Sequence, residues 1–288
     1  MAITFVTCFF DIGRETDASL QKFDNYFAWI ERLLQVPINL YFFTSPEIHD
    51  KLQYTSRSNL KFHFIPEIPY FEHLDVIREA WTYYRTGNPK KDTPEFAAIT
   101  HAKFILLCRA MRENPFGDEH YGWIDAGLLK IATNAELIPT LQSPNLIRTM
   151  MLSYTGMEEV KEEEFVKTCR YKFAGGLFVG PKDLLRVYCL RMIAEAEYHL
   201  SRGKFGLEQE YMAIIYRRHP ELFDCYYGTF TDLIVNYNGL HTSYPLIRNI
   251  FIEALKYNDR EEAGKVAHYV CNSNIEGIDR QAMEPFVK

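Results

Sequence analysis

Short apolar segments alternate with longer segments of helical periodicity in the first part of the chain. The β-branched and aromatic residues 3–10 predict a buried first strand, and the Asp-Ile-Gly sequence at 11–13 ends it with a loop. Residues 18–34 carry apolar side chains at helical spacing. Residues 38–44 and 60–65 predict two further short strands, because each is an apolar run that ends close to a proline. This alternation predicts an α/β fold with a mostly parallel sheet and helices on both of its faces.

Helix boundaries become easier to place from Thr93 onward. Thr93 predicts an N-cap and Pro94 the first residue of a helix that runs to Met111. This helix leads to an apolar strand that ends at Asp125. The acidic segment 153–167 predicts a helix with a solvated face.

The last third of the chain carries further strand and helix patterns. We predict a glycine-containing strand over 173–180, a long helix from Pro181 to Leu200, a helix from Gly206 to about His219, a short strand over 232–237, and terminal helices over 245–257 and 260–269. No internal repeat or linker is evident, so the pattern favours one compact domain.

The composition excludes several classes of protein. The chain has 288 residues, a formal net charge of -6 and 15% aromatic residues, a balance that argues against a general nucleic-acid binder. The apolar start at 2–10 lacks a preceding basic region and is too short for a membrane span, so we expect neither a signal peptide nor a transmembrane segment. Dinucleotide-binding, Walker, serine-hydrolase and zinc-protease motifs are missing from the sequence.

The six cysteines show no CxxC pair and no zinc-ligand spacing. They are Cys8, Cys108, Cys169, Cys189, Cys225 and Cys271. Free thiols without such spacing are typical of a protein in a reducing compartment, so we expect a cytoplasmic location.

Asp125 is the most informative candidate for chemistry. It ends an apolar run and is followed by the small residues Ala126 and Gly127. In open α/β sheets ligands collect at the carboxyl ends of the strands, and a carboxylate there can hold a hard cation against a diphosphate. The alternative is an ordinary turn Asp that precedes a glycine.

Several strand ends and loops carry polar or glycine-rich sequences suited to one cleft. They are residues 7–14, 123–128, 174–180, 206–210 and 238–241. In this order the chain resembles the HtrL/YibB family of bacterial proteins, whose members look like glycosyltransferases of the GT-A type. The resemblance depends on residues 6–14, 121–128, 173–180 and 236–238, and it extends from Ile3 to about His241.

The resemblance implies a GT-A-like (Rossmann-like), mostly parallel central sheet flanked by helices, with a helical C-terminal segment. It implies one domain over 1–288, with a nucleotide-binding half (1–128), an acceptor half (129–245) and C-terminal helices (246–288). It also implies a nucleotide-diphosphate sugar bound on the sheet. The residues expected to contact this donor are Thr7, Phe9, Asp11, Arg14, Lys103, Asp125, Gly127, Gly175 and Gly176.

The resemblance also implies a divalent ion, Mn²⁺ or Mg²⁺, on an Asp-x-Asp motif. Asp125 matches the first carboxylate, but Gly127 stands in the place of the second, so we expect one carboxylate to act together with the donor phosphates. His241 is the candidate for a further metal ligand. Its alternative is an ordinary loop histidine.

Glu208 and Glu210, at a predicted helix start, resemble the acidic motif that opens the corresponding helix in GT-A enzymes. An inverting transfer needs a carboxylate to take the acceptor proton, and we favour Glu208 for this role. Alternatively, both acids only complement the helix dipole.

Other polar and aromatic residues have two interpretations. Arg14 contacts the diphosphate or is exposed, Asp11 holds the nucleoside or caps the next helix, and His101 and Lys103 neutralise the leaving group or are solvated. The aromatic residues with helical spacing form core or a sugar platform. They are Tyr26, Trp29, Trp81 and Tyr84.

The resemblance therefore implies a glycosyltransferase that moves a hexose or pentose, with a UDP-sugar as the expected donor, to a saccharide hydroxyl in glycan biosynthesis. Its partners are a nucleotide-sugar donor and a glycan acceptor, with no nucleic acid. The alternative is a non-catalytic protein that binds nucleotide sugars or carbohydrates at a degenerate GT-A site.

Overall fold

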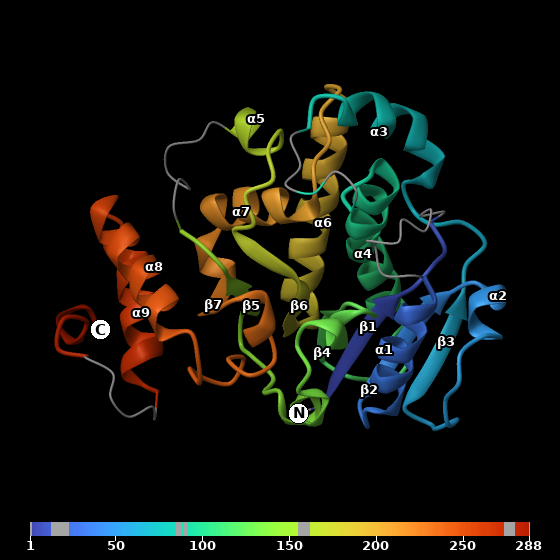
Figure 1. Ribbon diagram of the computed structural model, residues 1–288, viewed down its shortest axis with the longest axis horizontal. Helices are drawn as coiled ribbons and strands as arrows, with labels where there is room; N and C mark the ends of the chain where they lie inside the picture. Colours follow the sequence, from blue (N-terminus) through green and yellow to red (C-terminus); the bar gives the residue numbers. More distant parts are fainter. Residues whose placement is uncertain are drawn as a thin grey trace.

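The computed structural model describes residues 2–12, 23–84, 88, 91–154, 162–273 and 280–287. Within this part the centre is a seven-stranded sheet in the order β3-β2-β1-β4-β6-β5-β7 (Figure 1). Its strands are β1 (Ile3–Cys8), β2 (Asn39–Thr44), β3 (Leu60–Phe64), β4 (His120–Ile124), β5 (Ile147–Met151), β6 (Phe173–Pro181) and β7 (Phe223–Tyr227). Strand β6 is antiparallel to both neighbours, whereas the other neighbouring pairs are parallel. The predicted mostly parallel sheet is confirmed.

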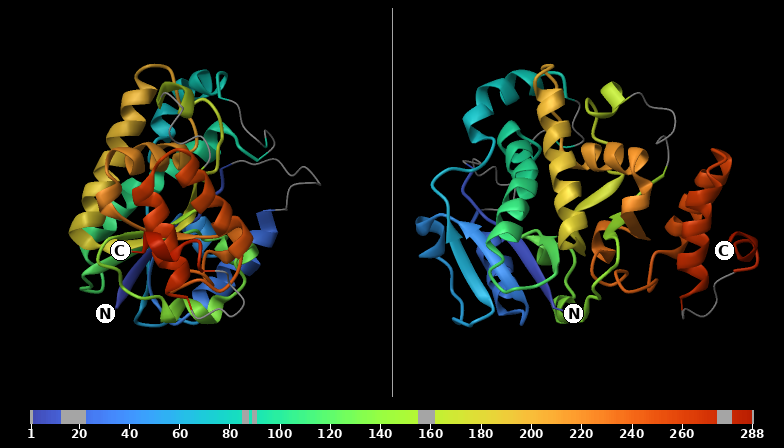
Figure 2. Two further views of the ribbon diagram at one scale, coloured as in Figure 1. Left: turned by 90° about the vertical axis from the view of Figure 1, so that its left-hand side faces the viewer. Right: turned by 180° about the vertical axis from the view of Figure 1, so that it is seen from behind.

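Helices cover both faces of this sheet. The α-helices are α1 (Phe23–Gln35), α2 (Pro46–His49), α3 (Leu74–Trp81), α4 (Pro94–Glu113), α5 (Glu162–Phe165), α6 (Lys182–Leu200), α7 (Glu208–Arg218), α8 (Tyr244–Lys256) and α9 (Arg260–Cys271). The 3₁₀ segments are η1 (Phe71–His73), η2 (Leu128–Lys130), η3 (Ala135–Thr140), η4 (Pro220–Leu222), η5 (Phe230–Asp232) and η6 (Glu284–Phe286). Helix α1 lies on one face, and α4 and α6 lie on the other, which faces the viewer on the right of Figure 2. Helices α8 and α9 form the predicted helical C-terminal segment beside β7 (Figure 1).

The central strand β1 is buried along its whole length, as expected for a parallel strand covered on both sides. Its side chains alternate between the two apolar cores. Val6 packs with Trp123 in the core under α4 and α6, whereas Phe5 packs with Leu33 of α1 in the core on the opposite face. The sheet therefore separates two apolar layers. Polar side chains are accommodated at the ends of its strands.

Most of the predicted elements are present within one or two residues of their expected bounds. Helix α4 begins at Pro94 with Thr93 as its N-cap, because the hydroxyl of Thr93 accepts a hydrogen bond from the amide of Phe96 at 3.2 Å. The predicted first helix is described from residue 23, and residues 18–22 lie outside the described part. In the acidic segment the structure describes the short helix α5, and residues 155–161 lie outside the described part.

The predicted strand over 232–237 is wrong. This segment begins with Asp232, the last residue of η5, and continues as turns. The start of η5 is fixed by a capping box in which the amide of Thr229 donates to the Asp232 carboxylate at 2.7 Å. The apolar side chains of Leu233 and Ile234, which suggested a strand, pack into the core on the α1 face instead of pairing in the sheet. The last strand is β7, ten residues earlier, and neither β7 nor its neighbour β5 was recognised in the sequence.

We expect Thr93→Ala to lower the free energy of unfolding by about 1 kcal/mol, because the amide at the start of α4 loses its acceptor. Urea unfolding of both proteins measures the difference. Thr140→Ala, at an exposed threonine on η3, is the control and should change stability by less than about 0.5 kcal/mol. Equal losses in the two variants would contradict a capping role.

Candidate active site

Asp125 lies directly after β4, at the edge where the carboxyl ends of β1, β2 and β4 meet. Its backbone amide donates to the carbonyl of Gly176 at 2.9 Å, which continues the pairing of β4 with β6. The indole Nε1 of Trp123 donates to Asp125 Oδ1 at 2.6 Å. The side chain of Asp125 is 48% exposed, so the carboxylate is held on one oxygen and open to solvent on the other side.

Lys103 lies inside the protein beside Asp125, with only 2% of its side chain exposed. Its ammonium, on α4, donates to the carbonyl of Gly175 at 2.9 Å and to Glu208 Oε1 at 2.9 Å. Asp125 Oδ1 is 3.6 Å from the same nitrogen. An ammonium has three donor protons, and three acceptors of the protein surround this one. The expected solvated or diphosphate-binding lysine is thus a buried link between two carboxylates.

Glu208 is the first residue of α7, and its side chain is 6% exposed. Burial by itself would raise the pKa of this carboxyl group. The charge and hydrogen bond of Lys103, together with smaller contributions from His101 and Thr100, hold the pKa below its usual range. Burial likewise disfavours the Lys103 ammonium, yet Asp125 and Glu208 keep the lysine pKa above its usual value. With all three groups ionised, the cluster carries a net charge of about -1 and opens to solvent at Asp125.

The paired glycines of β6 make room for this cluster. A Cβ atom on Gly175 would lie 2.2 Å from Glu208 Oε1 and 3.2 Å from Lys103 Nζ. A Cβ atom on Gly176 would lie 3.2 Å from Asp125 Oδ2. The close approach that the glycine pair predicts is therefore an approach of the β6 backbone to both carboxylates.

Gly127, where the Asp-x-Asp pattern has its second carboxylate, is in contact with an aromatic ring. A Cβ atom at this position would lie 3.1 Å from Tyr26 Cε1. The Tyr26 ring belongs to α1 and stacks on Phe9 at 5.8 Å between centroids, with Trp29 packed edge-on at 5.2 Å. A side chain at 127 would require this ring to shift by a few tenths of an ångström, so the packing of α1 favours the glycine found there.

Glu210 does not join the cluster of Lys103, Asp125 and Glu208. It is 1% exposed, and it accepts hydrogen bonds from the Tyr84 hydroxyl and from the amide of Arg170, both at 3.1 Å. Burial raises its pKa to about 8, and the negative charge of Glu208 adds to the effect. Glu210 is therefore a protonated interior acid near neutral pH, and Tyr84 belongs to the core that surrounds it.

His101 is also an interior side chain. Its Nε2 donates to the carbonyl of Gly206 at 3.1 Å, and its ring packs against Phe205 and Tyr211. Burial lowers its pKa to about 4. A neutral, buried imidazole does not neutralise a diphosphate, so that interpretation of His101 does not fit the structure.

The remaining candidates lie apart from the cluster or outside the described residues. Thr7 is fully buried, and its hydroxyl has no hydrogen-bond partner among the described residues, whereas Asp11 is exposed beyond the end of β1. Arg14 lies outside the described part. His241 is exposed, and its backbone amide donates to Asn236 Oδ1 at 2.9 Å, so Asn236 shapes this loop.

Within the described ranges, no group of three or more His, Cys, Asp and Glu side chains could hold a metal ion. Asp125 and His241 are therefore not parts of a preformed three-ligand site. The open oxygen of Asp125 is nevertheless the hard oxygen ligand that Mg²⁺ and Mn²⁺ accept when substrate oxygens complete the shell.

Sequence reasoning missed Trp123 as the residue that orients Asp125. Residues two apart on a strand point to the same face, so the Trp-Ile-Asp spacing contained the signal. It also missed Cys8, whose pKa is raised to about 12 by burial and by the nearby charge of Asp125. The Cys8 thiol is therefore uncharged near neutral pH, and it lies beside the charged groups of the site.

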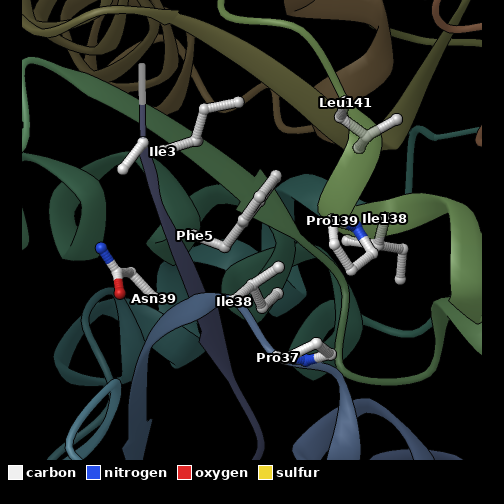
Figure 3. A pocket seen from close by; sticks show the side chains of 9 residues that line it. Ile3, Phe5, Pro37, Ile38, Asn39, Ile138, Pro139 and Leu141 are labelled. Atoms are coloured by element: carbon white, nitrogen blue, oxygen red, sulfur yellow. The ribbon is translucent and has the colours of Figure 1, made fainter.

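A cavity of about 180 Å³ opens at the opposite edge of the sheet (Figure 3). The residues that line it lie at the starts of β1 and β2 and on η3 with the residue after it: Ile3, Phe5, Pro37, Ile38, Asn39, Ile138, Pro139 and Leu141, together with Ala2. Asn39 is the polar side chain among them, and none of them is an acid or a base, so the cavity offers binding volume without catalytic groups.

The fold and this edge define the class: a mixed α/β protein with a solvent-facing carboxylate at the carboxyl ends of its parallel strands. Comparison with known proteins shows what the chain is similar to. Residues 1–66 match the family described as "Bacterial protein of unknown function (HtrL_YibB)". The chain is 20% identical to "Protein HtrL" of Escherichia coli (strain K12) over 257 residues, which cover 80% of this chain and 90% of the relative. Both matches agree with the resemblance to the HtrL/YibB family that the sequence indicated.

Among solved structures, the chain is similar to mouse xyloside xylosyltransferase 1 in its apo form. The identity is 14%, the TM-score is 0.36, and the match covers 77% of this chain and 84% of the other. Within the residues that the structure describes, no helix is long and apolar enough to cross a membrane.

We expect the stability of the protein to depend on pH through Glu210. The folded pKa of about 8 exceeds the ordinary value of 4.5, so the folded state binds the proton more tightly than the unfolded chain. Stability is therefore lost as pH rises from about 4.5 to about 8, by on the order of a few kcal/mol. Glu210→Gln, which stays neutral, should lose this dependence.

Urea unfolding between pH 5 and pH 9 measures the effect. Glu221→Gln is the matched control, because Glu221 is exposed and the substitution is the same. If the wild-type and Glu210→Gln stabilities change in parallel with pH, Glu210 is not a buried neutral acid.

Proposed function

We propose that this protein is a glycosyltransferase that moves a sugar from a nucleoside-diphosphate donor, most simply a UDP-sugar, to a saccharide hydroxyl. The observation that carries the proposal is the Asp125 carboxylate, open at the carboxyl edge of the sheet and tied to Lys103 and Glu208. Ligands of open α/β sheets bind at this edge. The resemblance to GT-A enzymes supplies the reaction type.

The charge of the cluster suggests how a donor binds. The Lys103 ammonium is engaged by protein acceptors, and the open oxygen of Asp125 would repel a bare diphosphate. A donor that arrives with Mn²⁺ or Mg²⁺ would instead find a ligand for its cation in Asp125. The bound ion would supply positive charge that stabilises the leaving diphosphate.

Glu208 is the carboxylate that we propose as general base. It is kept ionised by Lys103, and it lies in the same cluster as the open Asp125. An inverting transfer needs an ionised carboxylate to take the proton of the attacking hydroxyl. Glu210 is less suited to this role, because it is protonated near neutral pH and bonded inside the protein.

A second candidate function is nucleotide-sugar or carbohydrate binding without turnover. Gly127 favours it because it supplies no second carboxylate, and the low exposure of Glu208 also favours it. The two functions differ in reactivity with water: an enzyme slowly hydrolyses its donor, whereas a binding protein leaves it intact. A thermal-shift screen of nucleotides and nucleotide sugars, with and without Mn²⁺, identifies the donor to use, because a ligand of the folded state raises stability.

We expect Asp125→Asn to abolish metal-dependent donor binding, because the amide keeps the shape but loses the charge that opposes the cation. In calorimetric titrations the wild-type affinity for UDP should be at least about tenfold higher with Mn²⁺ than with chelator. Asp125→Asn should show the lower affinity in both conditions. Asp75→Asn, at a fully exposed aspartate of α3, should bind like wild type. Equal wild-type affinities in the two conditions would mean that protein cations neutralise the donor.

We expect Glu208→Gln to lower turnover on the order of 100-fold or more and to leave donor binding nearly unchanged. The amide keeps one acceptor oxygen for Lys103 but cannot take a proton from the acceptor. Glu210→Gln is the matched control, two residues further along α7. If only Glu210→Gln reduces turnover, the base is assigned to the wrong residue, and if neither does, a retaining mechanism is the better interpretation.

A further inference from the structure

We propose that Lys103 is a positioning residue, whose buried ammonium keeps Glu208 ionised in the interior and orients Asp125 at the open edge. The inference rests on the proposed function, because it assigns a role within the same site. It concerns a residue that touches neither donor nor acceptor. From the sequence alone, Lys103 is expected either to be solvated or to contact the donor diphosphate.

The geometry shows that Lys103 is committed to the protein. Its nitrogen lies 2.9 Å from Glu208 Oε1, 2.9 Å from the carbonyl of Gly175 and 3.6 Å from Asp125 Oδ1. These acceptors belong to α7, β6 and the end of β4, so one side chain of α4 joins three separate elements. At 2% exposure water does not compete for the ammonium. A phosphate could reach it only by displacing one of these partners.

The charges around Glu208 give Lys103 its effect. Several ionisable side chains interact electrostatically with Glu208 or with another member of the cluster, and they come from each element packed there. They are Lys103 and His101 on α4, Glu210 on α7, Asp125 after β4, Cys8 on β1 and Tyr188 on α6. Burial keeps His101 neutral near pH 7, with a pKa of about 4, and it raises the pKa values of Cys8 and Tyr188. Among these groups Lys103 is thus the cation that balances the buried carboxylate.

This arrangement suits the proposed transfer. As the acceptor oxygen forms its bond to the anomeric carbon, its proton passes to a Glu208 oxygen, and the bond to the diphosphate breaks with its electron pair on the leaving oxygen. Glu208 must be ionised before this step. Lys103 secures that state and does not itself exchange a proton or contact the reacting atoms.

The first test is the pH dependence of kcat/KM for Lys103→Met, which removes the charge and keeps most of the length. Without the ammonium, burial would raise the pKa of Glu208, so the acid limb of the profile should move upward by about one pH unit or more. At a pH on the acid limb of the wild-type profile, a shift of one unit lowers kcat/KM by about tenfold. Lys256→Met, at an exposed lysine of α8, is the control and should leave the profile unchanged. A folded Lys103→Met protein with an unmoved acid limb would overturn the proposal.

The second test does not need activity, so it separates this inference from the proposed function. The unfolding midpoint is measured for Lys103→Met in the Glu208 background and in the Glu208→Gln background. We expect a large loss in the first, growing as pH rises above about 4.5 because an unpaired carboxylate must ionise in the interior, and a smaller, pH-independent loss in the second.

Equal losses in the two backgrounds would overturn the role of Lys103 even if transfer were observed. If wild type neither transfers nor hydrolyses any donor, the proposed function fails, and unequal losses would still show that Lys103 controls the charge of Glu208. If Lys103→Met is unfolded in the Glu208 background and folded in the Glu208→Gln background, that difference is itself the expected coupling.

Discussion

The ammonium of Lys103 lies in the interior, where an ammonium without partners would cost several kcal/mol. Its position is tolerable only because Glu208, Asp125 and the carbonyl of Gly175 surround it. These partners come from three elements, so the positions of α4, the start of α7, the end of β4 and the first half of β6 depend on one another. The same ion pair that satisfies the interior also sets the charge of the candidate site.

The direction of β6 is the second feature on which the site depends. Because β6 runs against β4, its first half lies beside the end of β4, and Gly175 and Gly176 stand opposite the cluster. A parallel strand at this place would bring its last residues there instead. The glycines leave the space that the carboxylates of Glu208 and Asp125 occupy. The β6 backbone therefore lines the site at Gly175 and Gly176, where side chains would fill the space.

Tyr26 of α1 lies close to the strand end that carries Asp125. A Cβ atom on Gly127 would lie 3.1 Å from its ring, so a side chain there would require the ring to shift by a few tenths of an ångström. The same ring stacks on Phe9. Tyr26 and Trp29 are half-buried, so both pack against the protein and also remain partly exposed to solvent.

The sequence determined most of the local structure and the types of reactive side chain that are available. Apolar runs marked β1, β2, β3, β4 and β6, helix signals marked the start of α4, and Asp125 was recognised at its strand end. The strand β5 was missed because Arg148 interrupts its apolar pattern. Its guanidinium is accommodated by the Asp224 carboxylate, by the Tyr237 carbonyl and by the rings of Tyr226 and Tyr237. That compensation comes from residues about 80 to 90 positions further along the chain.

Only the tertiary structure decided what the candidate residues do. Lys103 and Glu208 are 105 positions apart, and nothing in either segment indicates that they form a buried pair. Glu208 and Glu210 look equivalent in the sequence, yet the helix turns one toward Lys103 and the other toward Tyr84. The reason is physical: burial and charge at a site are set by side chains that folding brings together from distant segments, whereas local patterns record only each segment's own preference for helix, strand or turn.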